Sequence, residues 1–211
     1  MKRIGFVGFD SEDIALYLAR LLQTDEDNVV VVDHTRKLSL MRNAGIPHQL
    51  TGKSGMYRGN IEIFASATAC KFRKDAVIID YFGCYTELPE IKDCDIVIFT
   101  TDMIVYNAQL LKDVHVKDGA AKFLILRNAI RLKYDESYLI VETGQEFSRD
   151  QVFVIPYDEV DYRSKCYLCI DKMHSLGGLS EPMRKTLLYL YSYVEEKELK
   201  RKETALLLKQ A

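Results

Sequence analysis

The sequence predicts a three-layer α/β fold in which a mostly parallel β-sheet is covered by helices on both faces. The apolar runs VVVV, AVIID, DIVIF and KFLIL are continuous rather than alternating, which is typical of strands that are buried on both sides. Polar or amphipathic stretches separate these runs and suit helices. With 211 residues, 48% of them apolar and 28% charged, the chain is expected to form one domain over residues 1–211.

The first part of the chain reads as a β–α–β unit. Residues 3–8 are apolar and suit a strand, a helix is expected to start near Ser11, and residues 28–32 form the next apolar run. A further helix is predicted over Thr35 to Ala44, followed by a loop and a short strand within Thr51 to Ser66.

The same alternation continues through the second half. Expected there are strands at 76–80, 95–99, 122–126 and 151–156, with a helix from Tyr106 to His115. A long helix over about 181–208 then closes the domain, because no Gly or Pro follows Pro182 and apolar residues recur at helical spacing. No repeat or linker indicates a second domain.

Composition and charge exclude several functional classes. A net charge of −2 does not support broad nucleic-acid binding through phosphate neutralisation. No apolar run approaches the roughly 20 residues of a membrane-spanning helix, and MKRIGFVGF leads into a strand rather than a signal peptide. We therefore expect a cytoplasmic protein. The tail KELKRKETALLLKQA, with leucines among lysines, leaves peripheral contact with the inner face of the membrane as an alternative to a solvated helix end.

The five cysteines do not suggest a disulfide framework, because their number is odd and no export signal is evident. Cys166 and Cys169 have the C-x-x-C spacing of a zinc half-site or redox pair, but no second pair supplies the remaining ligands. Ordinary thiols and no metal site are expected.

Four segments carry landmarks in a fixed order. They are KRIGFVGFDSEDIALYLARLL with VVVVDHTRKLSL, then KDAVIIDYFGCYTELPEIKDCDIVIFTTDMIVYNAQLLKDV, then FLILRNAIRL with VFVIPYDEV, and finally SLGGLSEPMRKTLLYLYSYV. In this order they resemble the MinD/ParA family of P-loop ATPases, including its TadZ/CpaE-like branch, over nearly the whole chain. The resemblance implies a P-loop NTPase-like sheet and a nucleotide site at the ends of its strands.

The resemblance also places individual residues in that nucleotide site. In the family, the positions serve the phosphate loop, the end of the second strand, the Walker B aspartate, an asparagine that contacts adenine, and an Ile-Pro pair. The matching residues here are Gly8, Asp10, Ser11, Asp33, Asp80, Asn128 and Pro156.

The phosphate loop is where this chain departs from the family. The family motif is approximately K-G-G-x-G-K-[ST], whereas this chain has F-D-S-E-D and lacks both lysines. A phosphate loop wraps backbone N–H groups around a phosphate, with glycines allowing the approach and a lysine neutralising charge. Here Asp10, Glu12 and Asp13 would face the phosphates with no cation in reach, at a cost of roughly 4 kcal/mol per charge pair about 4 Å apart. Alternatively, Asp10 or Ser11 is a helix N-cap, with Glu12 and Asp13 complementing the helix dipole.

These observations favour a catalytically inactive pseudo-ATPase with no bound cofactor and no catalytic residue. We expect it to act in localisation, scaffolding or assembly through protein partners. We also expect a homodimer, formed through the face at which family members meet across bound nucleotide. One alternative is an ATPase with a non-standard phosphate loop, binding ATP or ADP with Mg²⁺ through Asp33, Asp80 and Asn128 with basic residues from elsewhere. The other is a Rossmann-type NAD(P)-binding protein based on Gly8 and Asp33, although Asp10 and Asp13 replace two of its glycines.

Overall fold

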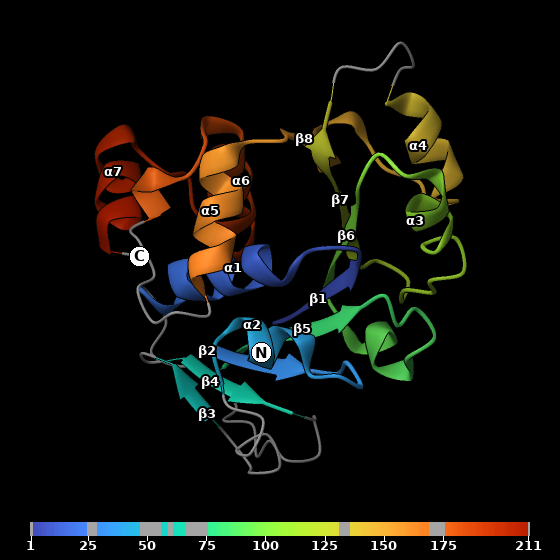
Figure 1. The fold of residues 1–211 in the computed structure, drawn as a ribbon, viewed down its shortest axis with the longest axis horizontal. Helices are drawn as coiled ribbons and strands as arrows, with labels where there is room; N and C mark the ends of the chain where they lie inside the picture. Colours follow the sequence, from blue (N-terminus) through green and yellow to red (C-terminus); the bar gives the residue numbers. More distant parts are fainter. Residues whose placement is uncertain are drawn as a thin grey trace.

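The computed structural model describes residues 2–24, 29–46, 56–58, 61–65, 76–130, 136–168 and 176–210, which form one eight-stranded sheet flanked by helices (Figure 1). The strands are β1 (Arg3–Gly8), β2 (Val29–Asp33), β3 (Met56–Arg58), β4 (Ile61–Phe64), β5 (Val77–Gly83), β6 (Ile96–Thr101), β7 (Ala121–Ala129) and β8 (Val152–Pro156). Their order in the sheet is β3-β4-β2-β5-β1-β6-β7-β8.

Every neighbouring pair of strands is parallel except β3 and β4. The predicted mostly parallel sheet is therefore confirmed, and β2, β5 and β6 are buried along their whole length, as their continuous apolar runs indicate. Because the strands are parallel, their carboxyl ends share one edge of the sheet. That edge is where ligands bind in open α/β folds.

Helices cover both faces of the sheet, which confirms the three-layer architecture. They are α1 (Glu12–Gln23), α2 (Ser39–Asn43), α3 (Val105–Gln109), α4 (Ser137–Glu142), α5 (Glu159–Tyr167), α6 (Glu181–Glu195) and α7 (Arg201–Gln210), with 3₁₀ turns at η3 (Pro89–Asp93), η4 (Arg149–Gln151) and η6 (Leu176–Gly178). The larger core packs α1, α2 and α6 on one face, and a second core packs α3 and α4 on the other (Figure 1).

The predicted single helix over 181–208 is wrong, because the chain forms two helices there. Glu196 adopts a left-handed backbone conformation with φ of 55° and ends α6. The Lys2 ammonium donates to the carbonyl oxygen of Val194, which a continuing helix would use, and to the Glu196 carboxylate, 2.7 Å away. Because neither Gly nor Pro marks the end of α6, the sequence did not predict it.

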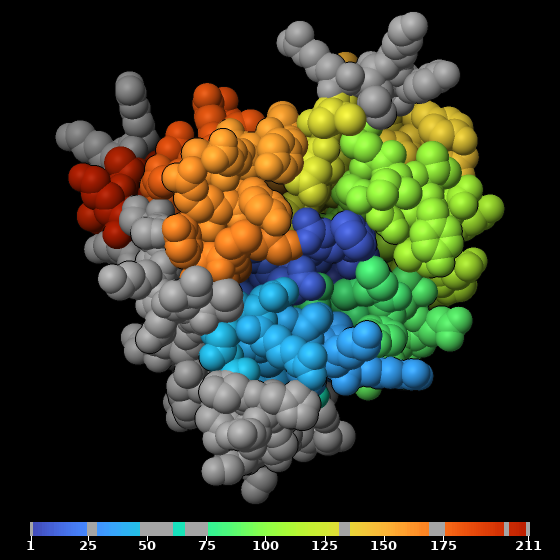
Figure 2. Space-filling model, viewed as in Figure 1, coloured from blue at the N-terminus to red at the C-terminus, as the bar shows by residue number. Residues whose placement is uncertain are grey.

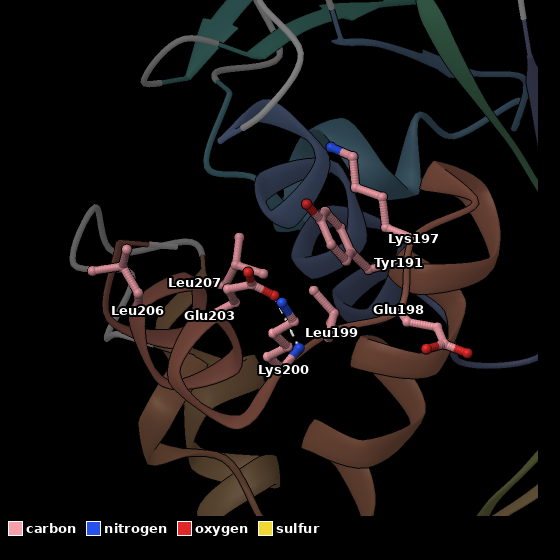
Figure 3. A pocket seen from close by; sticks show the side chains of 8 residues that line it. All are labelled: Tyr191, Lys197, Glu198, Leu199, Lys200, Glu203, Leu206 and Leu207. Carbon is pink, nitrogen blue, oxygen red and sulfur yellow. Dashed lines mark hydrogen bonds between the residues drawn. The ribbon is translucent and has the colours of Figure 1, made fainter.

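Helix α7 folds back onto the larger core. Leu207 is buried and Leu208 packs against the core, whereas Leu206 is 56% exposed. A hollow of about 500 Å³ separates α7 from α6 (Figure 3), lined by Tyr191, Lys197, Glu198, Leu199, Lys200, Glu203, Leu206 and Leu207. Most of the apolar face of the tail is thus used internally, and its contact with a membrane stays a prediction. None of the described helices combines the length and apolar composition that a bilayer crossing requires.

Two predicted helices are shorter than expected, and two helices were not predicted. The helix predicted over Thr35 to Ala44 is reduced to α2, because Leu38 has a left-handed φ of 50° just before it. The helix predicted over Tyr106 to His115 is reduced to α3, which a turn follows. Helix α5 lies in a segment too polar to show a clear apolar period, and α4, with the sequence SYLIVE, is too short to show one.

Gly8, at the end of β1, is required by its surroundings. Its φ is +121°, and a Cβ at this position would lie 2.0 Å from the carbonyl oxygen of Thr100. We expect Gly8→Ala to lower the free energy of unfolding by about 3 kcal/mol or more, measured by denaturant titration. Gly178→Ala is the control, because no atom lies within 4 Å of the added Cβ there. Equal stability of the two variants would contradict this account of the β1 end.

Candidate functional site

The bend between β1 and α1 occupies the place that the resemblance assigns to a phosphate loop. Only Phe9, Asp10 and Ser11 connect the two elements, and the Phe9 N–H donates to the carbonyl oxygen of Thr100 at 2.9 Å. Asp10 has a left-handed φ of 60°, a conformation that aspartate tolerates better than most residues. Three residues are too few to surround a phosphate with backbone N–H groups.

A buried ion pair fixes the amino end of α1 to β7. The Arg127 guanidinium donates to both carboxylate oxygens of Asp13, at 2.6 and 2.8 Å, and the Asp13 side chain is fully buried. Arg127 also donates to the backbone carbonyl of Asp10. Such two-point pairing is among the stronger polar interactions in proteins and holds both groups in one orientation.

A second cation reaches the bend from α5. The Lys165 ammonium contacts the Asp10 carboxylate and lies 3.8 Å from the Glu12 carboxylate. The expectation that no cation is in reach of the bend is therefore wrong. Arg127 and Lys165 neutralise two of the three carboxylates, so the chain's own carboxylates hold the cations that a phosphate would need.

Glu12 and Tyr81 contact each other beneath the bend. Burial raises the pKa of the Glu12 carboxyl, against its hydrogen bonds to its own backbone N–H and to the Tyr81 hydroxyl. Burial and the Glu12 charge raise the pKa of Tyr81, so this hydroxyl stays protonated.

Ser11 stands at the N-cap position of α1, but its side chain accepts no hydrogen bond from the helix. The expected side-chain cap is thus wrong for Ser11, although Glu12 and Asp13 do lie in the first turn of the helix as predicted. The Ser11 hydroxyl is fully buried and lies next to the Tyr81 hydroxyl.

Asp33 lies at the end of β2, as predicted, but serves a turn. Its buried carboxylate accepts hydrogen bonds from the Thr35 N–H at 2.9 Å, the Thr35 hydroxyl at 2.7 Å and the Met41 N–H at 3.0 Å. These bonds hold α2 against the sheet. A carboxylate that is fully buried and occupied in this way is not presented to a ribose or to Mg²⁺.

Asp80 does not lie at the predicted strand end or beside the bend. It is in the middle of β5, and its neighbours Ile79 and Tyr81 point toward the α1 side, so Asp80 points to the opposite face. There it accepts two hydrogen bonds of 2.9 Å from Arg3 and lies 2.8 Å from His34 Nε2. These partners compensate the buried carboxylate, so Asp80 can stand inside β5, which continues to Gly83.

Asn128 and Pro156 do lie at the carboxyl edge, near the ends of β7 and β8. Asn128 is exposed and has a left-handed φ of 52°, and the next residue, Ala129, pairs with Pro156. Asn128 and Pro156 thus share the carboxyl edge of the sheet with Gly8, Asp10 and Ser11, and Arg127, next to Asn128, contacts Asp10. Contact between Asn128 and an adenine stays a prediction.

The remaining sequence-based expectations concern cysteines. Cys166 lies on α5 with an exposed side chain, whereas Cys169 lies outside the described residues. Within the described ranges, no group of three or more His, Cys, Asp or Glu side chains is arranged to hold a metal ion.

The sequence patterns did not identify Arg127 and Lys165, the two cations that contact the bend. Arg127 was detectable, because strand alternation places it on the same face as Phe123 and Ile125, which pack in the α1-side core. A charged residue at that position needs a buried partner. Lys165 gave no comparable signal, since α5 itself was not predicted.

Comparison with known proteins supports the fold of this chain. No protein-family model matches the sequence, and no curated protein matches it. Among solved structures, the chain is similar to a ParA family ATPase from Chlorobium tepidum TLS, with a TM-score of 0.58 and 17% sequence identity over 90% of this chain and 98% of that one. The chain thus has a MinD/ParA-like P-loop NTPase fold, and at this identity the likeness concerns the fold alone.

The ion pair between Asp13 and Arg127 should be tested by removing one partner. Arg127→Gln leaves a buried, uncompensated carboxylate, so we expect it to lower the free energy of unfolding by about 3–5 kcal/mol. The double variant with Asp13→Asn should recover part of that loss. The control is Arg163→Gln, which removes an exposed pair with Glu159 (3.1 Å) and should change stability little. Similar losses for Arg127→Gln and Arg163→Gln in denaturant titrations would contradict the buried pair.

The raised pKa of Glu12 predicts a pH dependence with a definite sign. The folded state holds this proton more tightly than the unfolded state, so the stability due to Glu12 is lost as pH rises from 4.5, its ordinary value, through the raised pKa. Glu12→Gln cannot ionise at this position. As pH rises through this range, its free energy of unfolding should therefore increase relative to that of the wild type.

The matched control for this pH dependence is Glu181→Gln. The Lys185 ammonium lowers the pKa of Glu181, so the stability due to Glu181 is lost as pH falls. Its difference from the wild type should therefore run in the opposite direction. A Glu12→Gln profile parallel to that of the wild type would refute the effect of burial.

Proposed function

We propose that this MinD/ParA-fold chain does not bind or hydrolyse nucleotide at the β1–α1 bend and acts instead through protein contacts. Its role would be localisation, scaffolding or assembly, as in the TadZ/CpaE-like branch of the family that its sequence resembles. The observation that carries the proposal is the pairing of Arg127 and Lys165 with carboxylates of the bend itself.

Electrostatics of the bend support this proposal. Three carboxylates, from Asp10, Glu12 and Asp13, stand against two cations, which leaves one negative charge when all groups are ionised. A triphosphate would have to displace the Asp10 carboxylate from Lys165 and then lie beside it. Two like charges about 4 Å apart at an effective dielectric constant near 20 repel by roughly 4 kcal/mol, or on the order of a thousandfold in affinity.

The two enzyme-like alternatives are less well supported. An ATPase that uses Mg²⁺ would need Asp33 or Asp80 at the bend, but Asp33 is buried against Thr35 and Asp80 faces the other side of the sheet. The same burial of Asp33 argues against a Rossmann-type NAD(P) site. A homodimer across the carboxyl edge stays a prediction, which a light-scattering mass would test.

Calorimetry with ATP, ADP and NAD, each with and without Mg²⁺, tests the proposal. We expect no heat of binding with any of them, because the two cations that the described structure places at the bend, Arg127 and Lys165, are paired with its carboxylates. Micromolar binding of ATP or ADP would contradict the proposal, and binding of NAD alone would favour the dinucleotide alternative.

The double variant Asp10→Asn, Glu12→Gln tests why nucleotide is excluded. It leaves Asp13 paired with Arg127 and frees Lys165, so the net charge of the bend changes from −1 to +1. We expect pyrophosphate to bind the variant at least about tenfold more tightly than the wild type, measured by calorimetry at low salt. The matched control removes two acids elsewhere, in Glu181→Gln, Glu203→Gln, and should bind like the wild type. Equal binding by all three proteins would mean that these carboxylates do not exclude phosphate.

A further inference from the structure

Two exposed tyrosines and an isoleucine gather where β7 and β8 end and α5 begins. We call this the tyrosine surface; its members are 55–59% exposed and comprise Ile130, Tyr157 and Tyr162. The rings of Tyr157 and Tyr162 lie 6.4 Å apart, and the Tyr157 N–H donates to Ala129, the neighbour of Ile130. Large exposed apolar groups that adjoin one another are characteristic of interaction sites.

The tyrosine surface continues into the β1–α1 bend. Lys165 follows Tyr162 by three residues on α5, so both side chains lie on neighbouring positions of one helix face. Lys165 contacts Asp10, and Phe9 beside it is 38% exposed. Figure 2 shows the atoms of α5, in orange, directly beside the dark blue atoms of the bend.

Among the described residues of this combined surface, acidic side chains outnumber basic ones. The bend retains one negative charge when all its groups are ionised. At the start of α5, Glu159 pairs with Arg163 at 3.1 Å, and Asp158 accepts a hydrogen bond from the Val160 N–H. This excess of carboxylates disfavours nucleic acids and anionic lipids as the occupant.

We propose that the tyrosine surface and the bend together dock a segment of a partner protein that carries arginine or lysine next to apolar side chains. The inference rests on the proposed function, because a bound nucleotide would cover the bend. The basic groups of the partner would face the carboxylates of Asp10 and Glu12 and stack on Tyr157 and Tyr162. Its apolar side chains would cover Ile130.

The test is a nuclear magnetic resonance titration of the full chain with a short synthetic peptide in which arginine alternates with phenylalanine and glycine. A second peptide with glutamate in place of arginine is the control for charge. We expect backbone signals of residues 9–13 and 157–165 to shift with the arginine peptide only, and the affinity to fall as salt screens the charges.

Variants of equal exposure separate the tyrosine surface from general stickiness. Tyr157→Ala and Tyr162→Ala should each weaken binding of the arginine peptide about two- to fivefold, the range that exposed cation–π contacts give. Tyr138→Ala is the matched control, because Tyr138 is 54% exposed on α4 and should leave the affinity unchanged. Asp10→Asn should also weaken binding of the peptide, although it favours phosphate.

Each other outcome overturns the inference. Absence of shifts, shifts with the glutamate peptide, or an equal effect of Tyr138→Ala would show that the surface does not select basic segments. A dimer detected by light scattering, together with concentration-dependent shifts of the signals of residues 157–165, would assign the surface to a second copy of the chain. If the peptide titration fails and calorimetry still shows no heat of binding with ATP, the proposed function stands without this inference. Binding of ATP by the wild type would instead overturn the proposed function, and this inference with it.

Discussion

The carboxyl edge of this sheet depends on the buried contact between Asp13 and Arg127. It joins the first helix to the seventh strand, whose residues are 114 positions apart in the chain, and both side chains are almost completely withdrawn from solvent. Burial of two charges costs several kcal/mol for each ion, and this cost is offset only when geometry and further hydrogen bonds are favourable. Here the guanidinium binds both carboxylate oxygens, and Asp13 lies in the first turn of α1, where the helix dipole favours a negative charge.

The same contact changes what the edge can bind. In a P-loop fold, the amino end of the first helix and nearby cations are available to phosphate. In this chain, Asp13 and Asp10 take the place of that anion, since they hold Arg127 and Lys165. The other acids of the expected site have internal partners too: Asp33 holds α2 and Asp80 holds Arg3 and His34. Acids that would serve a nucleotide thus serve the fold, and the surface around the bend becomes acidic and tyrosine-rich.

Much of the fold could be predicted from the sequence, because buried parallel strands leave continuous apolar runs. The P-loop NTPase-like type of sheet followed from the resemblance, and the shortness and acidity of the bend were visible in FDSED. What could not be predicted was pairing across long distances. Arg127 stands 114 residues after Asp13, and Lys165 stands 155 residues after Asp10, on a helix with no clear apolar period. Asp80 was misplaced for a related reason, since its partners Arg3 and His34 allow a charge inside a strand. The break at Glu196 likewise depends on Lys2, at the other end of the chain.

Side-chain nitrogen resonances of Arg127, followed while pyrophosphate is added to the wild-type protein, test the central claim most directly. The two-point contact with Asp13 restricts rotation of the guanidinium, so separate Nη signals are predicted, unchanged at every pyrophosphate concentration. Movement or merging of these signals as pyrophosphate is added would show that Arg127 is available to an anion, and the account of a bend filled by its own carboxylates would be wrong.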